Sequence, residues 1–218
     1  MGTLSSALGL LLILTFMVVP SAYAAPQVIT FEADPLGVKP NGYSPVGFPG
    51  VFLTDTVGAE LEIVAADGTQ CNSGQCLRVP TDVDGSALRI DFSFLATALS
   101  VTYGNDDPGF TAPGDVAIIQ LFNGATLVGS VSQVLNRNDI MDQTISISGP
   151  AFNNALFFFG KPDGSTTTGP APDGIDVGLV ERVDNITFDT TAAVPEPGTL
   201  LLLGSGLAGF AAWRRRRE

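Results

Sequence analysis

Carboxylates are the residues of this chain with the widest chemical scope, because histidine is absent. The 218 residues include 22 Asp and Glu residues and no His. Without imidazole, Ser-His-Asp and Cys-His catalysis and the common zinc and copper sites built on histidine are excluded. Carboxylates remain available as the acid and base of a glycosidase or as oxygen ligands of Ca²⁺. No catalytic pair stands out, so we expect a protein that is not an enzyme; a small glycan-active hydrolase is the alternative.

Cys71 and Cys76 are the only cysteines of the chain. In an oxidising compartment such a closely spaced pair forms a disulfide, and Gly74 between them allows the chain to turn. A redox-active pair, the alternative, would need the tighter Cys-x-x-Cys spacing. The spacing therefore predicts a disulfide that stiffens the tip of a hairpin.

The C-terminal segment combines a proline-rich leader, an apolar run and an arginine cluster. Pro195 and Pro197 favour an extended leader, and Thr199 to Trp213 carries no charge. As a helix this run is ~22 Å long, short against a ~30 Å hydrocarbon core. By the positive-inside rule the arginines place the C-terminus in the cytoplasm. The segment predicts one short transmembrane helix; a generic tail anchor or a buried helix is the alternative. The cluster is Arg214, Arg215, Arg216 and Arg217.

The triplet Pro195-Glu196-Pro197, followed by the apolar run and the arginines, resembles the PEP-CTERM sorting tail of Gram-negative bacteria. The resemblance covers residues 193–218. It implies recognition by an exosortase, a membrane enzyme similar to cysteine proteases. It also implies that the chain is held in the inner membrane before it is sorted to the cell surface or extracellular matrix. Whether the tail is cut off is left open, and nothing is implied about the domain in front of it.

The N-terminus has the pattern of a secretory signal peptide over residues 1–24. Leu8 to Val19 is apolar, and Ala22-Tyr23-Ala24 is a small-x-small cleavage signal. We expect signal peptidase to cut after Ala24, so that the mature chain begins at Ala25. The segment before the apolar run lacks Lys and Arg, and an uncleaved signal anchor is the alternative.

Residues 25–192 remain for one exported domain, long enough to bury a core. This part contains 6 Lys and Arg residues against 20 Asp and Glu residues. A domain of this charge is repelled by nucleic acid and by anionic membranes, so we expect no nucleic-acid partner.

The apolar pattern of this region has the period of a β-strand. In Ser86 to Phe94, the residues Leu88, Ile90, Phe92 and Phe94 alternate with polar ones. Asn123-Gly124 between two apolar runs is a strong hairpin signal. Many short strands with regular turns predict an all-β sandwich or barrel. The other expected strands are Val28–Glu32, Glu60–Ala65, Ala98–Tyr103, Asp115–Phe122, Thr126–Ser132, Gln143–Ser148, Asn154–Phe159 and Val183–Asp189.

Four segments, Val28–Glu32, Gly47–Phe52, Leu99–Asp107 and Val183–Phe188, resemble the jelly-roll domains related to carbohydrate-binding modules and galactose-binding-like folds. The resemblance implies a jelly-roll-like antiparallel β-sandwich whose first and last strands are neighbours. It also implies a structural Ca²⁺ beside these strands, for which Glu32 and Asp184 are the candidate ligands. The alternative is that both are solvated strand-end residues.

Five aromatic residues leave two interpretations open: a stacking platform for sugars or part of the core. Most aromatic residues of a β-sandwich are buried, which favours the core. They are Tyr43, Phe48, Phe52, Tyr103 and Phe110.

Taken together, these patterns predict an exported, non-catalytic protein of the cell surface or extracellular matrix. The resemblances imply association with extracellular polysaccharide, through carbohydrate binding or adhesion. A purely structural matrix protein is the alternative to a binding protein.

Overall fold

The computed structural model describes residues 25–58, 60–71, 74–80, 86–166, 181–190 and 204–205. One compact unit spans Ala24–Thr191, and Met1–Tyr23 with Ala192–Glu218 form a second. The first unit contains all the described strands and the described hydrophobic core, which is what a domain needs to fold alone. The predicted signal peptide, and all of the tail except Gly204 and Ser205, lie outside the described residues. In the described ranges we find no helix with the length and apolar character to cross a membrane.

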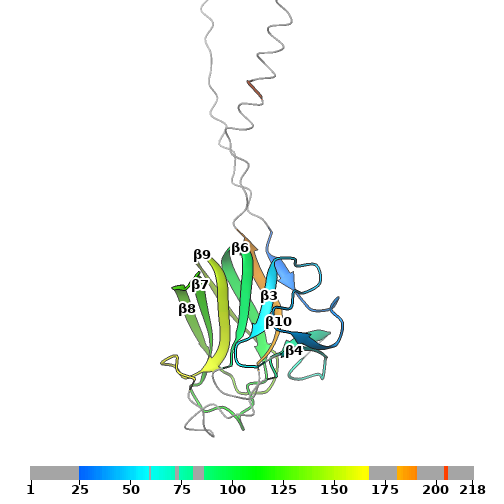
Figure 1. Cartoon of the computed structure of the whole chain (residues 1–218). Coiled ribbons are helices and arrows are strands. Elements are labelled where there is room, and N and C mark those ends of the chain that lie inside the picture. Colours follow the sequence, from blue (N-terminus) through cyan, green and yellow to red (C-terminus); the bar gives the residue numbers. More distant parts are fainter. Residues whose placement is uncertain are drawn as a thin grey trace, which may run out of the picture. The chain divides into compact units, whose positions relative to one another are not determined.

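The described strands form one antiparallel sheet with the order β2-β4-β5-β10-β6-β9-β7-β8, in which β1 also pairs with β10 and β3 with β6 (Figure 1). The strands are β1 (Gln27–Ile29), β2 (Gly37–Pro40), β3 (Val51–Asp55), β4 (Glu60–Ala65), β5 (Gln75–Arg78), β6 (Leu88–Gly104), β7 (Val116–Asn123), β8 (Thr126–Val134), β9 (Gln143–Gly160) and β10 (Arg182–Thr190).

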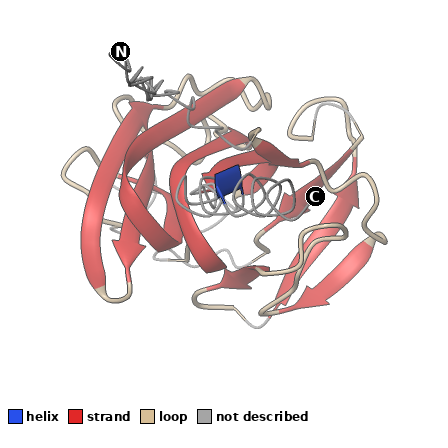
Figure 2. Cartoon of the chain, turned by 90° about the horizontal axis from the view of Figure 1, so that it is seen from above, coloured by secondary structure: helices blue, strands red, loops and turns tan. Residues whose placement is uncertain are grey.

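Two long strands, β6 and β9, join the two halves of the fold. The first part of β6 pairs with β3 and with the end of β9, whereas its second part pairs with β10 and with the start of β9. Register shifts between Asp91 and Ala98 separate the two parts. The sheet thereby folds over on itself and encloses the core, as the view from above shows (Figure 2). The predicted all-β antiparallel sandwich is confirmed.

The sequence pattern divided both long strands incorrectly. Ser86–Phe94 and Ala98–Tyr103 were predicted as two strands and are one, and the same holds for Gln143–Ser148 and Asn154–Phe159. At the register shifts the alternation of buried and exposed residues breaks. The sequence pattern therefore predicts that a strand ends there, although the strand continues. Three short strands, β2, β3 and β5, were not predicted, since they have only four or five residues each.

The predicted hairpin at Asn123-Gly124 is confirmed. Asn123 pairs with Thr126, so Gly124 and Ala125 form a two-residue loop between β7 and β8. Gly124 has a φ of 60°, in the left-handed region that such a tight turn requires.

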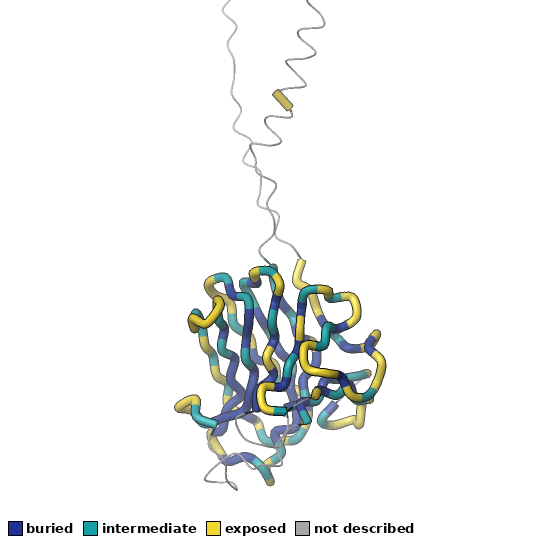
Figure 3. The backbone as a smooth tube through the Cα atoms, in the orientation of Figure 1, coloured by how far each residue is buried: buried dark blue, intermediate teal, exposed yellow. Residues whose placement is uncertain are grey.

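The core is built from buried aliphatic and aromatic residues, and Figure 3 shows the buried positions in dark blue along the strands. Phe157 is fully buried, and its ring centroid lies 5.5 Å from that of Tyr103 and 5.7 Å from that of Phe159. Of the five aromatics considered as a sugar platform, Tyr103 is fully buried and three pack against the core. Phe52 is the exception, at 40% exposed. The core interpretation is therefore confirmed for four of the five.

Replacing Phe157 with alanine tests this core. We expect F157A to lower the free energy of unfolding by about 3–5 kcal/mol, because it leaves a cavity among packed rings. F52A is the matched control and should cost less than about 1 kcal/mol, since its ring is partly in solvent. Urea unfolding of residues 24–191 measures both, and equal losses would contradict the packing described here.

Candidate functional site

The outer face of β10, β6 and β9 carries a grid of small polar side chains. Residues directly opposite one another in antiparallel strands share one face of the sheet. Their neighbours along these strands, such as Leu99, Val101 and Ile145, are buried on the inner face. The three rows of the grid, each read from β10 through β6 to β9, are Asp184–Thr102–Thr144, Thr187–Ser100–Ser146 and Asp189–Ala98–Ser148.

A shallow groove of about 350 Å³ lies over the second and third rows. Its polar lining consists of hydroxyl groups and one carboxylate, from Ser100, Ser146, Ser148, Thr187 and Asp189. The other five of the ten lining residues are apolar: Pro26, Ala98, Leu99, Ile147 and Phe188. Hydroxyl groups both donate and accept hydrogen bonds, so this lining suits a neutral, hydroxyl-rich ligand. The volume is at the lower end of the range of small-molecule sites, roughly 300–1,000 Å³.

The first row of the grid ends in a buried acidic group. The hydroxyl groups of Thr102 and Thr144 lie 3.0 Å apart and hydrogen-bond to each other. Asp184, next in the row, is only 6% exposed. Burial raises the pKa of its carboxyl to about 6; the Asn185 N–H, 2.7 Å away, opposes the rise, and the charge of Glu32 adds to it. The structure therefore places the two predicted ligands, Glu32 and Asp184, close enough for the charge of Glu32 to raise the pKa of Asp184.

Glu32 is held in place by residues of the loop that the disulfide closes. Its carboxylate accepts a hydrogen bond from the Gln75 N–H at 2.9 Å, and its C=O accepts one from the Gln75 side chain at 3.2 Å. Gly74 has a φ of 67°, and a Cβ there would collide with the Glu32 carboxylate. Glycine is thus required for Glu32 to approach this turn.

The Ca²⁺ that these two carboxylates were predicted to bind stays a prediction. Two carboxylates in mutual repulsion, one of them buried, fit the donor chemistry of a hard cation. In the ranges that the structure describes, however, no group of three or more Asp, Glu, Cys or His residues is arranged to hold a metal. Within these ranges, any further ligands would be carbonyl or amide oxygens, or water.

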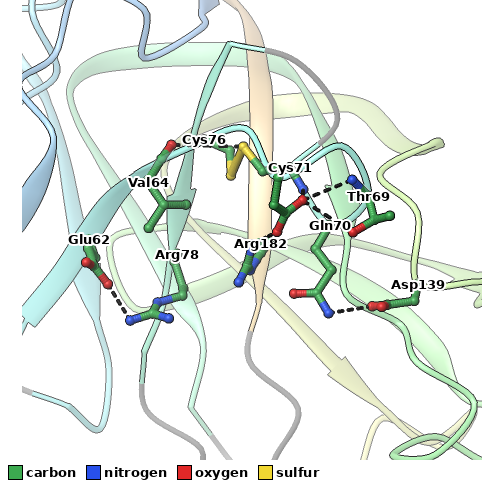
Figure 4. A network of polar contacts seen from close by, with 10 residues as sticks. Glu62, Val64, Thr69, Gln70, Cys71, Cys76, Arg78, Asp139 and Arg182 are labelled. Atoms are coloured by element: carbon green, nitrogen blue, oxygen red, sulfur yellow. Dashed lines mark hydrogen bonds and ion pairs between the residues drawn. A yellow bond between two sulfur atoms is a disulfide. The ribbon is translucent and has the colours of Figure 1, made fainter.

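The predicted disulfide between Cys71 and Cys76 is confirmed, with 5.9 Å between the Cα atoms. Figure 4 shows how polar contacts fasten its loop to other elements. The Arg182 guanidinium of β10 lies 2.6 Å from Asp67, whose carboxylate also accepts the N–H groups of Thr69 and Cys71. Burial opposes ionisation of Asp67, but these bonds outweigh it and lower its pKa. On the far side, the Gln70 side chain donates to Asp139 at 2.7 Å.

The sorting residues predicted at the termini cannot be placed in the same way. Pro195, Glu196 and Pro197 lie outside the described residues, as does the cluster Arg214 to Arg217. At the predicted signal cleavage site, Ala24 lies outside the described residues. Ala25 is the first described residue and is exposed.

The hydroxyl grid was not predicted from the sequence. Its signal is the alternation of Ser and Thr with aliphatic residues in Leu99–Tyr103 and Gln143–Ser148. This alternation predicts a solvent-facing side for each strand, but it does not reveal that three such sides adjoin.

The tail resemblance is supported by a family model. The PEP-CTERM protein-sorting motif matches residues 193–217. A motif of this kind implies export, processing by an exosortase and sorting to the cell envelope of Gram-negative bacteria. A search of curated proteins finds no match to the chain.

Several solved structures match the chain at low identity. An arabinose-bound GH51 α-L-arabinofuranosidase is 13% identical with a TM-score of 0.45, over 78% of this chain and 27% of the enzyme, so the chain spans about a quarter of that protein. A family 6 carbohydrate-binding module is 13% identical with a TM-score of 0.36, over 72% of this chain and 95% of the module. CsCBM6-3 from Clostridium stercorarium, in complex with cellobiose, is 12% identical with a TM-score of 0.35, over 72% and 95% of the two chains. Sequence identities and TM-scores this low support no conclusion about the function of this chain.

The raised pKa of Asp184 predicts how stability depends on pH. With a pKa of about 6 when folded against 3.8 ordinarily, the folded protein binds this proton more tightly than the unfolded chain. This contribution to stability is therefore full below about pH 4 and is lost as the pH rises through about 6. We expect D184N to lack this loss and to exceed the wild type at pH 7 by on the order of 2–3 kcal/mol. E32Q should recover a smaller part, since burial is the larger cause.

Urea unfolding of residues 24–191 between pH 4 and pH 7, in EDTA, measures this dependence. Added Ca²⁺ should stabilise the wild type at pH 7 but not D184N, if the two carboxylates hold the ion. A wild-type stability that does not change between pH 4 and pH 7 would refute the assignment of the raised pKa.

Proposed function

We propose that this chain is an exported, non-catalytic protein of the cell surface or extracellular matrix, and that its domain binds a neutral glycan along the groove on β10, β6 and β9. The observation that carries the proposal is the mixed lining of this groove, in which four hydroxyl side chains and one carboxylate lie among five apolar residues, as the hydroxyl groups and apolar faces of a sugar require. The sorting motif supports the location, and the groove supports the kind of ligand.

The groove favours a polyol over other ligands. Four of its lining residues carry hydroxyl groups, and Asp189 adds an acceptor that can bridge neighbouring sugar hydroxyls. The lining contains no cation that would attract phosphate or sulfate. With 20 acidic residues against 6 basic ones in residues 25–192, the domain also repels anionic polymers over long distances. A neutral polysaccharide satisfies both conditions.

Binding is favoured over hydrolysis by the same lining. Glycosidases of the common kind use two carboxyl groups on opposite sides of the bond that they break. Asp189 is the only carboxylate among the residues that line the groove. Asp184 belongs to the first row of the grid, and Glu32 lies in the loop that follows β1. We propose that these two carboxylates hold a structural Ca²⁺. This ion would relieve their repulsion and fasten the first strand to the last.

A bulky residue in the centre of the groove tests the binding site. Ser100 lies between Thr187 and Ser146 in the second row, so we expect S100L to weaken glycan binding at least about tenfold by filling the groove. T126L is the matched control, because Thr126 is an exposed residue of the β7–β8 hairpin outside the lining, and it should bind as the wild type does. An array of neutral glycans, probed with residues 24–191 in Ca²⁺ and in EDTA, identifies the ligand. Absence of binding in both conditions would refute the binding role and favour a purely structural protein.

Changes in the tail test the sorting role separately. We expect replacement of Pro195, Glu196 and Pro197 by alanine, or removal of Arg214 to Arg217, to leave the chain at the inner membrane or mis-sorted. Fractionation of cells into inner membrane, surface and medium measures the outcome. Unchanged surface delivery of both variants would contradict sorting through this motif, whatever the domain binds.

A further inference from the structure

β8 ends the sheet and has no described strand on its outer side. It has nine residues, Thr126 to Val134, and pairs on its inner side with β7. Leu127 is 51% exposed and Val134 is 60% exposed, and both exposed fractions are large for apolar side chains. A long, uncharged edge strand with exposed apolar residues is a place where another strand can add to a sheet.

The backbone groups that face this open edge follow from the pairing with β7. The Leu135 N–H donates to the Asp115 C=O at 2.9 Å, and Val131 stands opposite Ile119 in the same register. Hydrogen-bonded pairs alternate along an antiparallel ladder. The N–H and C=O groups of Ser130, Ser132 and Val134 therefore point away from β7. The Gln143 side chain already donates to the Val134 C=O, at 2.9 Å, which leaves Ser130 and Ser132 to offer both of their groups.

The charge pattern says which partner fits this edge. Residues 116–135 contain no Asp, Glu, Lys or Arg, and neither do residues 143–160 of the neighbouring β9. Residues 25–192 have 20 acidic residues against 6 basic ones, so two copies repel each other where charged surfaces meet. The strands β9, β7 and β8 therefore form an uncharged side of the sheet, at which a second copy can approach with less repulsion.

The opposite end of the sheet is protected, which limits the assembly. β2 has four residues and includes Pro40, which has no N–H to donate, and Lys39, whose ammonium group donates to the Gly37 C=O at 2.9 Å. Short edges with proline and lysine are those that natural proteins keep from pairing. Pairing of one edge with the same edge of a second copy about a two-fold axis uses that edge in both copies, so it forms a closed pair and does not continue into a filament.

We propose that β8 is a self-association edge, at which two copies of this chain pair their β8 strands antiparallel about a two-fold axis. In this arrangement Ser130 of each copy stands opposite Ser132 of the other. The two hydrogen-bonded pairs use the outward groups that β7 leaves free. The exposed apolar surface of Leu127 and Val134 flanks this centre. The proposal does not depend on glycan binding.

Sedimentation equilibrium of residues 24–191 tests the proposal. We expect the wild type to show a concentration-dependent monomer–dimer equilibrium. S130E/S132E should be monomeric at every concentration, because it sets like charges opposite each other at the axis. S132P should weaken dimerisation by removing an outward N–H while leaving the hydrogen bonds to β7 intact. V38E, on the exposed edge of β2, is the matched control and should dimerise as the wild type does.

Circular dichroism and urea unfolding report whether each variant is folded. If S132P fails to fold, the double variant S130E/S132E still tests the proposed dimer. A wild type that remains monomeric up to its solubility limit would overturn the proposal. So would a dimer that S130E/S132E leaves unchanged, or one that V38E disrupts to the same degree. Growth into larger oligomers at high concentration would contradict a closed two-fold pair.

Discussion

Pairing between β6 and β9 is the interaction on which the rest of the domain depends. Each strand contributes to both halves of the sheet, so the inner residues of both halves, such as Ile90 and Val101, meet in one core. Successive residues of a strand face opposite sides, and a slip of one residue would exchange the buried and the exposed sets. The burial of Leu99, Val101 and Ile145 therefore also places Ser100, Thr102 and Ser146 on the outer face. The groove is a consequence of the core register and needs no loop to build it.

A second constraint is electrostatic and acts where the first strand meets the last. Asp184 is buried beside Glu32, and its raised pKa shows that the folded state bears a cost there at neutral pH. The disulfide loop holds Gln75 against Glu32, while Arg182 and Asp67 fasten that loop to β10. Such an arrangement keeps two acids close against their repulsion, which structures rarely retain without a use. A bound cation would turn this cost into a stabilising contact.

The sequence predicted those features that depend on one segment at a time. The alternation in Leu88–Phe92, the turn at Asn123-Gly124 and the bond between Cys71 and Cys76 are all local, and the structure has them. Glu32 and Asp184 were singled out only through resemblance to a fold, since 152 positions of sequence separate them. The hydroxyl grid could not be predicted, because it requires the register of three strands that are remote in sequence. The continuation of β6 past Phe94 was missed for the same reason. It depends on pairing with neighbouring strands and not on the local sequence pattern.

Charge and strand edges together suggest how an acidic exported domain can act on a polymer. Groove residues project from the face of the sheet, whereas the outward groups of β8 lie in its plane, so pairing at the edge does not use the atoms that would contact a glycan. Two grooves in one dimer could engage the same polysaccharide chain, and the second contact would then be intramolecular. A shallow groove of mixed polar and apolar lining, weak by itself, would hold a repeating polymer firmly in this way. Under the proposed function, the acidic surface elsewhere would keep the pairs from aggregating with one another.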